Sequence, residues 1–202
     1  MDTEKTIVVA TNNIGKLKEI KSVLGNELKI LSLNDINCEI EVEEDGKTFE
    51  ENALKKAREV YKRVNIPCLA DDTGLCIDYF DGWPGIRTAR FLGEKVSKAE
   101  RNDYILSKME QIQKAERKAK VITSLALVID EKHEIVVEGQ LEGYIAIKKK
   151  GQNGFGFDEI FELETGNTLA ELSLEEKNKL SSRKRALEEL KKKIFINKGE
   201  FL

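Results

Sequence analysis

Two adjacent acids, Asp71 and Asp72, follow the apolar segment Cys68-Leu69-Ala70, and their chemistry stands out first. A carboxylate at the end of a buried strand is costly without a partner, which weakens the interpretation as a plain surface turn. Neighbouring strand side chains face opposite sides of a sheet, so we expect the two acids to have different roles. Mg²⁺ takes one or two carboxylates together with waters and substrate phosphates, so a magnesium site is one use for such acids.

A second acidic group lies before Gly46 and contains Glu41, Glu43, Glu44 and Asp45. Its oxygens could contribute to the same ion site. A solvated turn is the more common explanation for such a charge run, and both interpretations stay open at this point.

The segment Thr11-Asn12-Asn13-Ile14-Gly15-Lys16 carries groups that suit phosphate. It lies between an expected strand and an expected helix, and a helix start offers N–H groups and a positive dipole end to an anion. Gly15 permits close approach, and Lys16 supplies a positive charge. The segment is neither a Walker A loop nor a GxGxxG motif, so an ordinary capped turn is an equally good interpretation.

The glycine-rich stretch from Gly151 to Asp158 contains two aromatic residues, Phe155 and Phe157. Either ring could stack on a base, which contributes about 1–3 kcal/mol per base. The alternative is a tight turn with both rings in the core. Further along, Lys177 and Arg183 could donate hydrogen bonds to base carbonyls or to phosphate, although bare charges on helices are usually exposed.

The elements that must position these residues alternate between strands and helices, which predicts an α/β fold. Apolar runs predict strands at 7–10, 28–33 and from 68, and a long hairpin of 121–129 and 134–148 that turns near His133. Helical spacing predicts helices from residue 14 to about 24, over 49–64 and 98–115, and after Ser181. Thr48 with Glu51, and Ser173 with Glu176, have the spacing of capping boxes.

The chain has 202 residues, with 34 Lys and Arg against 37 Asp and Glu, and a formal net charge of −3. This length can bury a core without staples, and we expect one domain over residues 1–202 that contains two lobes. The nearly balanced charge argues against broad binding to nucleic acid or to a membrane surface.

Cys38, Cys68, Cys76 and the single His133 lack the spacing of a disulfide framework, a zinc site or a Cys-His catalytic pair. No stretch approaches the roughly 18 apolar residues of a membrane span, and the N-terminus does not have the pattern of a signal peptide. We therefore expect a cytoplasmic protein with reduced thiols.

Taken together and in order, the motifs resemble the inosine triphosphate pyrophosphatase family, whose members hydrolyse noncanonical purine nucleoside triphosphates. The resemblance covers almost the whole chain. The matching segments are ATNNIGK at 10–16, EEDGKTFEENA at 43–53, ADDTGL at 70–75, GWPGIRTARF at 82–91, GFGFD at 154–158, AEL at 170–172, EEKN at 175–178 and SSR at 181–183.

The resemblance implies an elongated mixed central sheet flanked by helices, a nucleotide cleft between two lobes, and a magnesium-dependent homodimer. The reaction would convert ITP, dITP or XTP to the monophosphate and pyrophosphate. The triphosphate would be held by Thr11, Asn12, Asn13, Ile14, Gly15 and Lys16. Sugar and base would be recognised by Phe155, Gly156, Phe157, Asp158, Lys177, Ser182 and Arg183.

The same resemblance makes Asp72 the catalytic residue and a magnesium ligand, with Thr73 beside it touching substrate. Glu43 has the matching spacing for the second ligand, and Glu44 is one residue away. Ser182 stands where the family has histidine, and serine lacks the reach and the ring of imidazole. A pyrophosphatase of altered base choice is therefore one alternative. A nucleotide-binding module without catalysis is an alternative of a different class.

Overall fold

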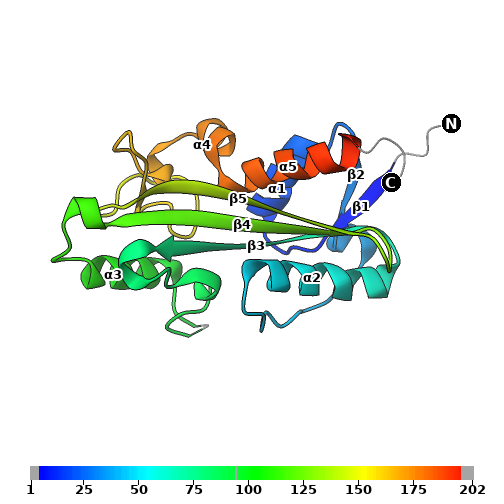
Figure 1. Ribbon diagram of the computed structural model, residues 1–202, viewed down its shortest axis with the longest axis horizontal. Coiled ribbons are helices and arrows are strands. Elements are labelled where there is room, and N and C mark those ends of the chain that lie inside the picture. The colour runs from blue at the N-terminus through cyan, green and yellow to red at the C-terminus, as the bar shows by residue number, and fades with distance from the viewer. Residues whose placement is uncertain (1–4, 94, 197–202) are drawn as a thin grey trace. The chain divides into compact units, whose positions relative to one another are not determined.

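The computed structural model of the protein describes residues 5–93 and 95–196. The strands are β1 (Thr6–Val9), β2 (Lys29–Ser32), β3 (Cys68–Ile77), β4 (Lys118–Val128), β5 (Glu134–Ile145) and β6 (Phe161–Glu162). The α-helices are α1 (Ile14–Leu24), α2 (Phe49–Val64), α3 (Lys98–Lys108), α4 (Leu174–Leu180) and α5 (Ser182–Ile196), as labelled in Figure 1.

The strands form a sheet in the order β2-β1-β3-β4-β5-β6. β1 pairs in parallel with β2 and with β3, whereas β5 and β6 are antiparallel, so the sheet is mixed. The predicted class, an α/β fold with a mixed central sheet and flanking helices, is confirmed.

The described chain divides into two compact units. The first unit contains residues 5–72, 123–139 and 182–196. The second unit contains residues 73–93, 95–122 and 140–181. β3, β4 and β5 each supply residues to both units. The single domain over residues 1–202 and the nucleotide cleft between two lobes stay predictions.

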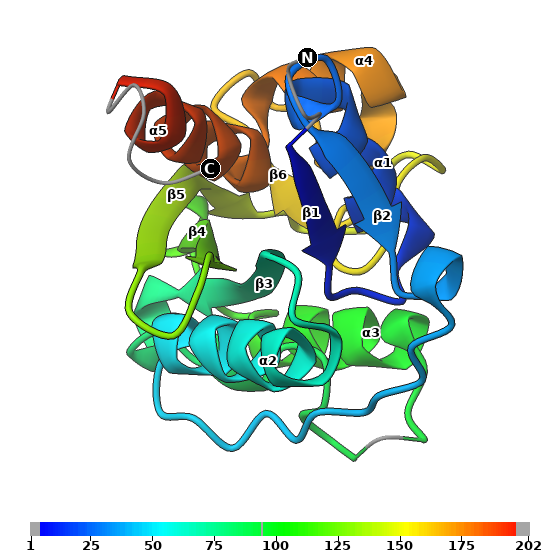
Figure 2. The same cartoon turned by 90° about the vertical axis from the view of Figure 1, so that its right-hand side faces the viewer.

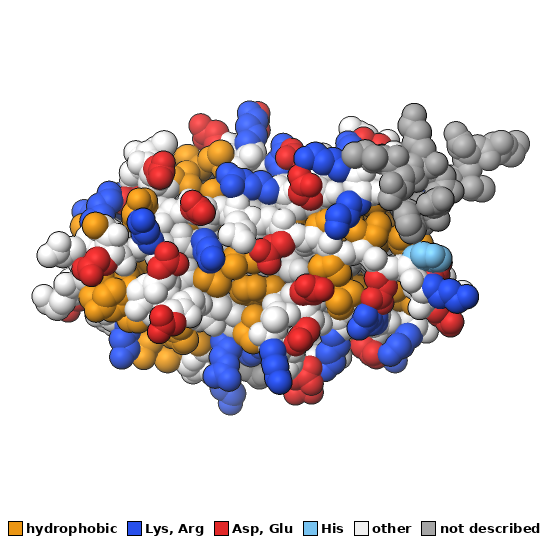
Figure 3. Space-filling view, viewed as in Figure 1, with side chains coloured by type: hydrophobic (Ala, Val, Ile, Leu, Met, Phe, Trp, Pro, Cys, Tyr) orange, Lys and Arg blue, Asp and Glu red, His pale blue; other side chains and the backbone are white. Residues whose placement is uncertain are grey.

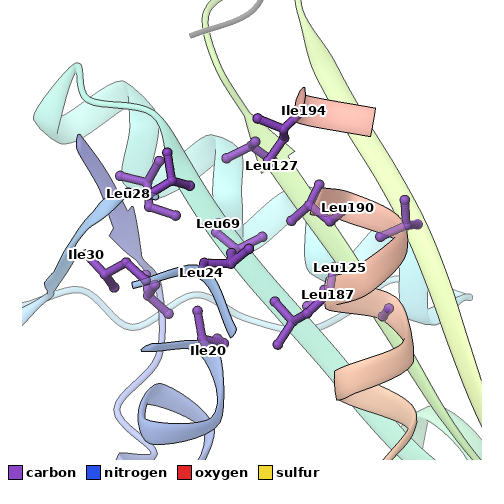
Figure 4. Packing of buried hydrophobic residues seen from close by; sticks show 14 residues of the cluster. Ile20, Leu24, Leu28, Ile30, Leu69, Leu125, Leu127, Leu187, Leu190 and Ile194 are labelled. Atoms are coloured by element: carbon purple, nitrogen blue, oxygen red, sulfur yellow. The ribbon is translucent and has the colours of Figure 1, made fainter. Parts of the chain in front are cut away.

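Strand alternation decides which helix covers which face of the sheet in the first unit. Ile7 and Val9 of β1 belong to a buried cluster with Ile20 of α1 and Leu190 of α5, and Figure 4 shows this packing. Val8, between them in the sequence, belongs to a second cluster with the buried alanines and valine of α2. α1 and α5 therefore lie on one side of β1 and β3, and α2 lies on the other (Figure 2).

The second unit has its own apolar core, built around Leu75 and Ile77 of β3, Ile105 of α3 and Phe161 of β6. The buried guanidinium of Arg117 donates to backbone carbonyls after α3 and at the end of β5, at Met109, Ile145 and Ala146. Among the residues that the structure describes, no helix is long and apolar enough to cross a membrane.

Two boundary predictions were wrong. The helix expected over 98–115 ends at Lys108, because the Met109 and Ile112 carbonyls accept hydrogen bonds from Arg117. The acids Asp71 and Asp72 lie inside β3 and not at its end. Leu75 and Ile77 continue the strand, since both are buried in the second unit's core.

The predicted helix starts are largely confirmed. Ser173 and Glu176 form a complete capping box at α4. At α2, Thr48 accepts from the Glu51 N–H as expected, but the Glu51 carboxylate accepts from the Lys47 N–H and not from the Thr48 N–H.

Lysines and arginines are interspersed with acids over the face drawn in Figure 3, in keeping with the near-neutral composition.

Candidate functional site

The turn between β1 and α1 holds the expected phosphate-binding segment, and Asn13 is the N-cap of α1. Asn13 Oδ1 accepts hydrogen bonds from the N–H groups of Gly15 and Lys16, at 2.9 and 3.3 Å. The Asn13 N–H donates to Thr11 Oγ1 at 3.2 Å. An anion bound at this helix start would compete with Asn13 Oδ1 for these two backbone N–H groups. Asn12 and Ile14, on either side of Asn13, are exposed.

Lys16 and Arg183 both bind the carboxylate of Asp71. Lys16 Nζ lies 2.9 Å from Asp71 Oδ2, and Arg183 donates to the same oxygen from Nε at 3.3 Å and Nη2 at 3.2 Å. Burial alone raises the pKa of the Asp71 carboxyl, but the charges of Lys16, Arg183 and Lys56 outweigh it, so the pKa lies well below its usual range. Asp71 is therefore ionised at neutral pH and orients two cations.

The side chain of Asp72 has different partners, as strand alternation predicts. Asn52 of α2 donates from Nδ2 to Asp72 Oδ2 at 2.9 Å. Burial raises the pKa of the Asp72 carboxyl against the lowering effect of Lys56, and the negative charge of Glu44 adds to the rise. A carboxylate whose pKa is shifted toward neutrality is better suited to taking up a proton than an ordinary aspartate.

Lys56 of α2 connects the acidic loop to β3. Its Nζ donates to Glu44 Oε1 at 2.5 Å and to the backbone carbonyl of Asp71 at 2.6 Å. Asn52 and Lys56 are four residues apart, on the same side of α2. One face of this helix therefore contacts both acids of β3.

The two candidate ligands in the loop have different surroundings. Glu44 acts on the pKa of Asp72, whereas Glu43 acts on that of Lys55. Among residues 5–93 and 95–196, no group of three or more His, Cys, Asp and Glu side chains could hold a metal ion. Asp72 and Glu44 are nevertheless a suitable donor pair for Mg²⁺, because that ion commonly uses only one or two carboxylates.

The second unit brings together Phe155, Asp158 and Lys177. Lys177 Nζ lies 2.5 Å from Asp158 Oδ2 and 4.1 Å from the centroid of the Phe155 ring. The Phe155 N–H also donates to Asp158 Oδ2, at 2.6 Å. Gly154 has a φ of +83°, and a Cβ there would lie 2.1 Å from Asp158 Oδ2, so this turn requires glycine.

The two aromatic candidates differ in exposure. Residue Phe155 is 36% exposed, whereas the Phe157 ring centroid lies 6.4 Å from that of Phe161, beside the core. Phe155 is therefore the ring that a base could reach. Asn102 of α3 donates to the Gly156 carbonyl at 2.9 Å and fixes the backbone between the two rings.

Ser182 and Thr73 complete the predicted set. Ser182 is 3% exposed, and its hydroxyl lies 2.8 Å from Thr123 Oγ1 of β4, so it is bonded to the sheet of the first unit. Thr73 follows Asp72 in β3 and is partly buried in the second unit.

Sequence reasoning did not single out Asn52 and Lys56. Their spacing of four on a helix that follows the acidic loop was the available signal, since it places an amide and an ammonium on one face. What they touch depends on how α2 packs on β3, which no local pattern reveals.

The fold and these contacts define an α/β protein in which a helix-start turn, two lysines and two buried acids lie together. The Ham1 family profile matches residues 7–193. A dITP/XTP pyrophosphatase from Clostridium perfringens is 43% identical over an alignment of 195 residues, and the alignment covers 93% of this chain and 96% of that protein. One from Geobacter sulfurreducens is 46% identical over 187 residues, with 92% and 94% covered.

A solved structure agrees with these relatives. The Staphylococcus aureus Ham1 protein matches with a TM-score of 0.87 at 33% identity, covering 96% of this chain and all of that one. The chain belongs to the Ham1 family. The resemblance inferred from the motifs is thereby confirmed.

Proposed function

We propose that this protein hydrolyses dITP, XTP and ITP to the nucleoside monophosphate and pyrophosphate, and so removes noncanonical purines from the nucleotide pool. The observation that carries the proposal is the family membership, with relatives at 43% and 46% identity that are named dITP/XTP pyrophosphatase. The contacts around Asp71 and Asp72 support it independently, because they supply a buried base beside cations that suit a polyphosphate.

The first unit would bind the triphosphate through Thr11 to Lys16. The positive end of the α1 dipole and the Lys16 ammonium both favour an anion here. Lys16 keeps a partly exposed side chain while Asp71 holds it in place. A phosphate oxygen would therefore meet an ammonium group that is already oriented.

Mg²⁺ would be held by Asp72 and a glutamate of the acidic loop. Our choice for this glutamate is Glu44 and not Glu43, because Lys56 connects Glu44 to the β3 backbone beside Asp72. When bound, the ion would neutralise negative charge on the phosphates.

Asp72 would accept the proton of the attacking water. Burial favours its protonated form, which assists proton uptake, and the Asn52 amide fixes the direction of the carboxylate. Lys56, between Glu44 and the β3 backbone, would keep the acidic loop close to Asp72.

The second unit would read the base. Phe155 offers an exposed ring for stacking, and Lys177 offers a donor that the carboxylate of Asp158 holds in place. A 6-keto group accepts such a hydrogen bond, whereas the amino group of adenine would leave the buried donor unsatisfied. Gly156, Phe157 and Thr73 belong to the same unit and would support this arrangement. Ser182 and Arg183 belong to the first unit, where Ser182 is bonded to Thr123 and Arg183 to Asp71 and Glu19. We further propose a cytoplasmic homodimer.

The proposal is tested by pyrophosphate release from dITP, XTP, ITP, ATP and GTP, each with magnesium chloride and with excess chelator. We expect kcat/KM for the first three to exceed that for ATP by tenfold or more, and activity to disappear with chelator. Equal rates on ATP and dITP would refute the base choice. Nucleotide binding without pyrophosphate release would indicate a non-catalytic module.

A further inference from the structure

Four buried or partly buried charges of alternating sign are connected in the first unit. They run from Lys16 to Asp71 at 2.9 Å, from Asp71 to Arg183 at 3.2 Å, and from Arg183 Nη1 to Glu19 Oε2 at 2.5 Å. The side chains of Asp71, Arg183 and Glu19 are 1%, 5% and 6% exposed, and that of Lys16 is 20% exposed. Of the four, Lys16 is the member that reaches solvent.

Two of these residues come from the same helix. Lys16 and Glu19 are three residues apart on α1, so they lie on one side of it. Arg183 is the second residue of α5, which packs against α1. The series of contacts therefore begins and ends on α1, the helix that follows the phosphate-binding turn.

The guanidinium of Arg183 is shared between two carboxylates. Its Nε and Nη2 donate to Asp71, and its Nη1 donates to Glu19. Removing the Glu19 charge takes one carboxylate away from the buried Arg183 guanidinium and leaves Asp71 to neutralise more of its charge, and an unbalanced buried charge is strongly unfavourable. Asp71 would then move toward Arg183, and Lys16 would lose its fixed orientation.

We propose that Glu19 is a positioning residue for the triphosphate-binding Lys16, acting through Arg183 and Asp71. The expected effect on dITP hydrolysis rests on the proposed function. Removing the Glu19 charge should affect the enzyme only while Lys16 is present.

The test is a double-mutant cycle with Glu19→Gln and Lys16→Ala, measuring kcat/KM for dITP. We expect Glu19→Gln to lower kcat/KM by about tenfold to a hundredfold, the range for one hydrogen bond between charged groups. In the Lys16→Ala background, the same substitution should change kcat/KM by less than twofold. Losses that multiply in the double variant, or a Glu19→Gln enzyme as active as wild type, would overturn the inference.

Two further variants separate positioning from simple destabilisation. Ile20→Val, on the adjacent buried position of α1, should lower the Tm but leave kcat/KM within twofold of wild type. If Glu19→Gln does not fold, Glu19→Asp replaces it, because this variant keeps the charge on a shorter side chain. We expect Glu19→Asp to lower kcat/KM by an intermediate factor, and we expect this loss to disappear in the Lys16→Ala background. A Glu19→Asp loss that persists in full there would count against the inference.

Binding of inorganic tripolyphosphate, measured by calorimetry, distinguishes this inference from the proposed function. A wild-type protein that does not hydrolyse dITP would refute the function. The inference would still require Glu19→Gln to weaken the binding of tripolyphosphate. In the Lys16→Ala background, Glu19→Gln should leave this affinity unchanged. Additive effects on affinity would contradict it.

Discussion

Asp72→Asn should remove most of the catalytic activity without unfolding the protein. Asparagine has almost the same shape, and its carbonyl oxygen can keep the hydrogen bond from Asn52 Nδ2, now 2.9 Å from Asp72 Oδ2. The variant cannot accept a proton from water as a carboxylate does. General-base catalysis contributes about 10²–10⁴-fold, so we expect kcat to fall by that range.

The stability of this variant should change in the opposite direction. Burial raises the pKa of Asp72, which means that the folded state disfavours the ionised carboxylate. At neutral pH, Asp72→Asn removes this cost, so the free energy of unfolding should rise. The gain should disappear at a pH below the ordinary aspartate pKa of about 3.9, where the side chain is protonated in both states.

Asp71→Asn is the matched control, because it changes the neighbouring acid in the same strand. Asp71 is 1% exposed and has two cations within 3.2 Å, and removing one partner of a buried pair costs about 3–5 kcal/mol. For a chain of this size, 1 kcal/mol corresponds to about 2–4 °C, so the Tm should fall by roughly 6–20 °C. The pair thus compares a buried carboxylate whose ionised form the fold disfavours with one whose ionised form the fold stabilises.

The assays are initial rates of pyrophosphate release from dITP and thermal unfolding of both variants at pH 7. A kcat for Asp72→Asn above one tenth of the wild-type value would refute the catalytic assignment. Equal losses of Tm in the two variants would refute the electrostatic reasoning.

Three other predictions concern single side chains. Lys16→Ala should weaken triphosphate binding at least tenfold more than monophosphate binding, measured by calorimetry, and equal weakening would place Lys16 away from the phosphates. Burial raises the pKa of the Cys68 thiol to about 12, so iodoacetamide at pH 8 should label the half-buried Cys38 first. Mass spectrometry that finds Cys68 labelled in the native protein would contradict this prediction. Asn102→Ala should raise KM for dITP severalfold with kcat little changed, because the Gly156 carbonyl loses its partner, and an unchanged KM would show that α3 does not support the base-binding turn.

Local patterns were sufficient for the elements that carry the candidate site. The apolar run at 7–10 followed by a polar turn predicted β1 and α1, and the spacing of Ser173 and Glu176 predicted the start of α4. Alternation along a strand also predicted that Asp71 and Asp72 have different partners. These features depend on residues that are close in sequence, so the sequence reveals them directly.

Features set by tertiary contacts could not be predicted in the same way. The end of α3 depends on Arg117, which takes up carbonyls that a longer helix would use. The partners of Asp72 come from α2 and the acidic loop, and Glu19 meets Arg183 across 164 positions of the chain. No spacing rule connects such residues before the packing of the helices is known.

The products of dITP hydrolysis show which phosphate bond the protein cuts. We expect quantitative anion chromatography of a completed reaction with magnesium to give one pyrophosphate for each dIMP, with no dIDP at any time. Formation of dIDP and inorganic phosphate would contradict the account, because it would mean that the protein cuts the terminal phosphate and not the bond between the α- and β-phosphates.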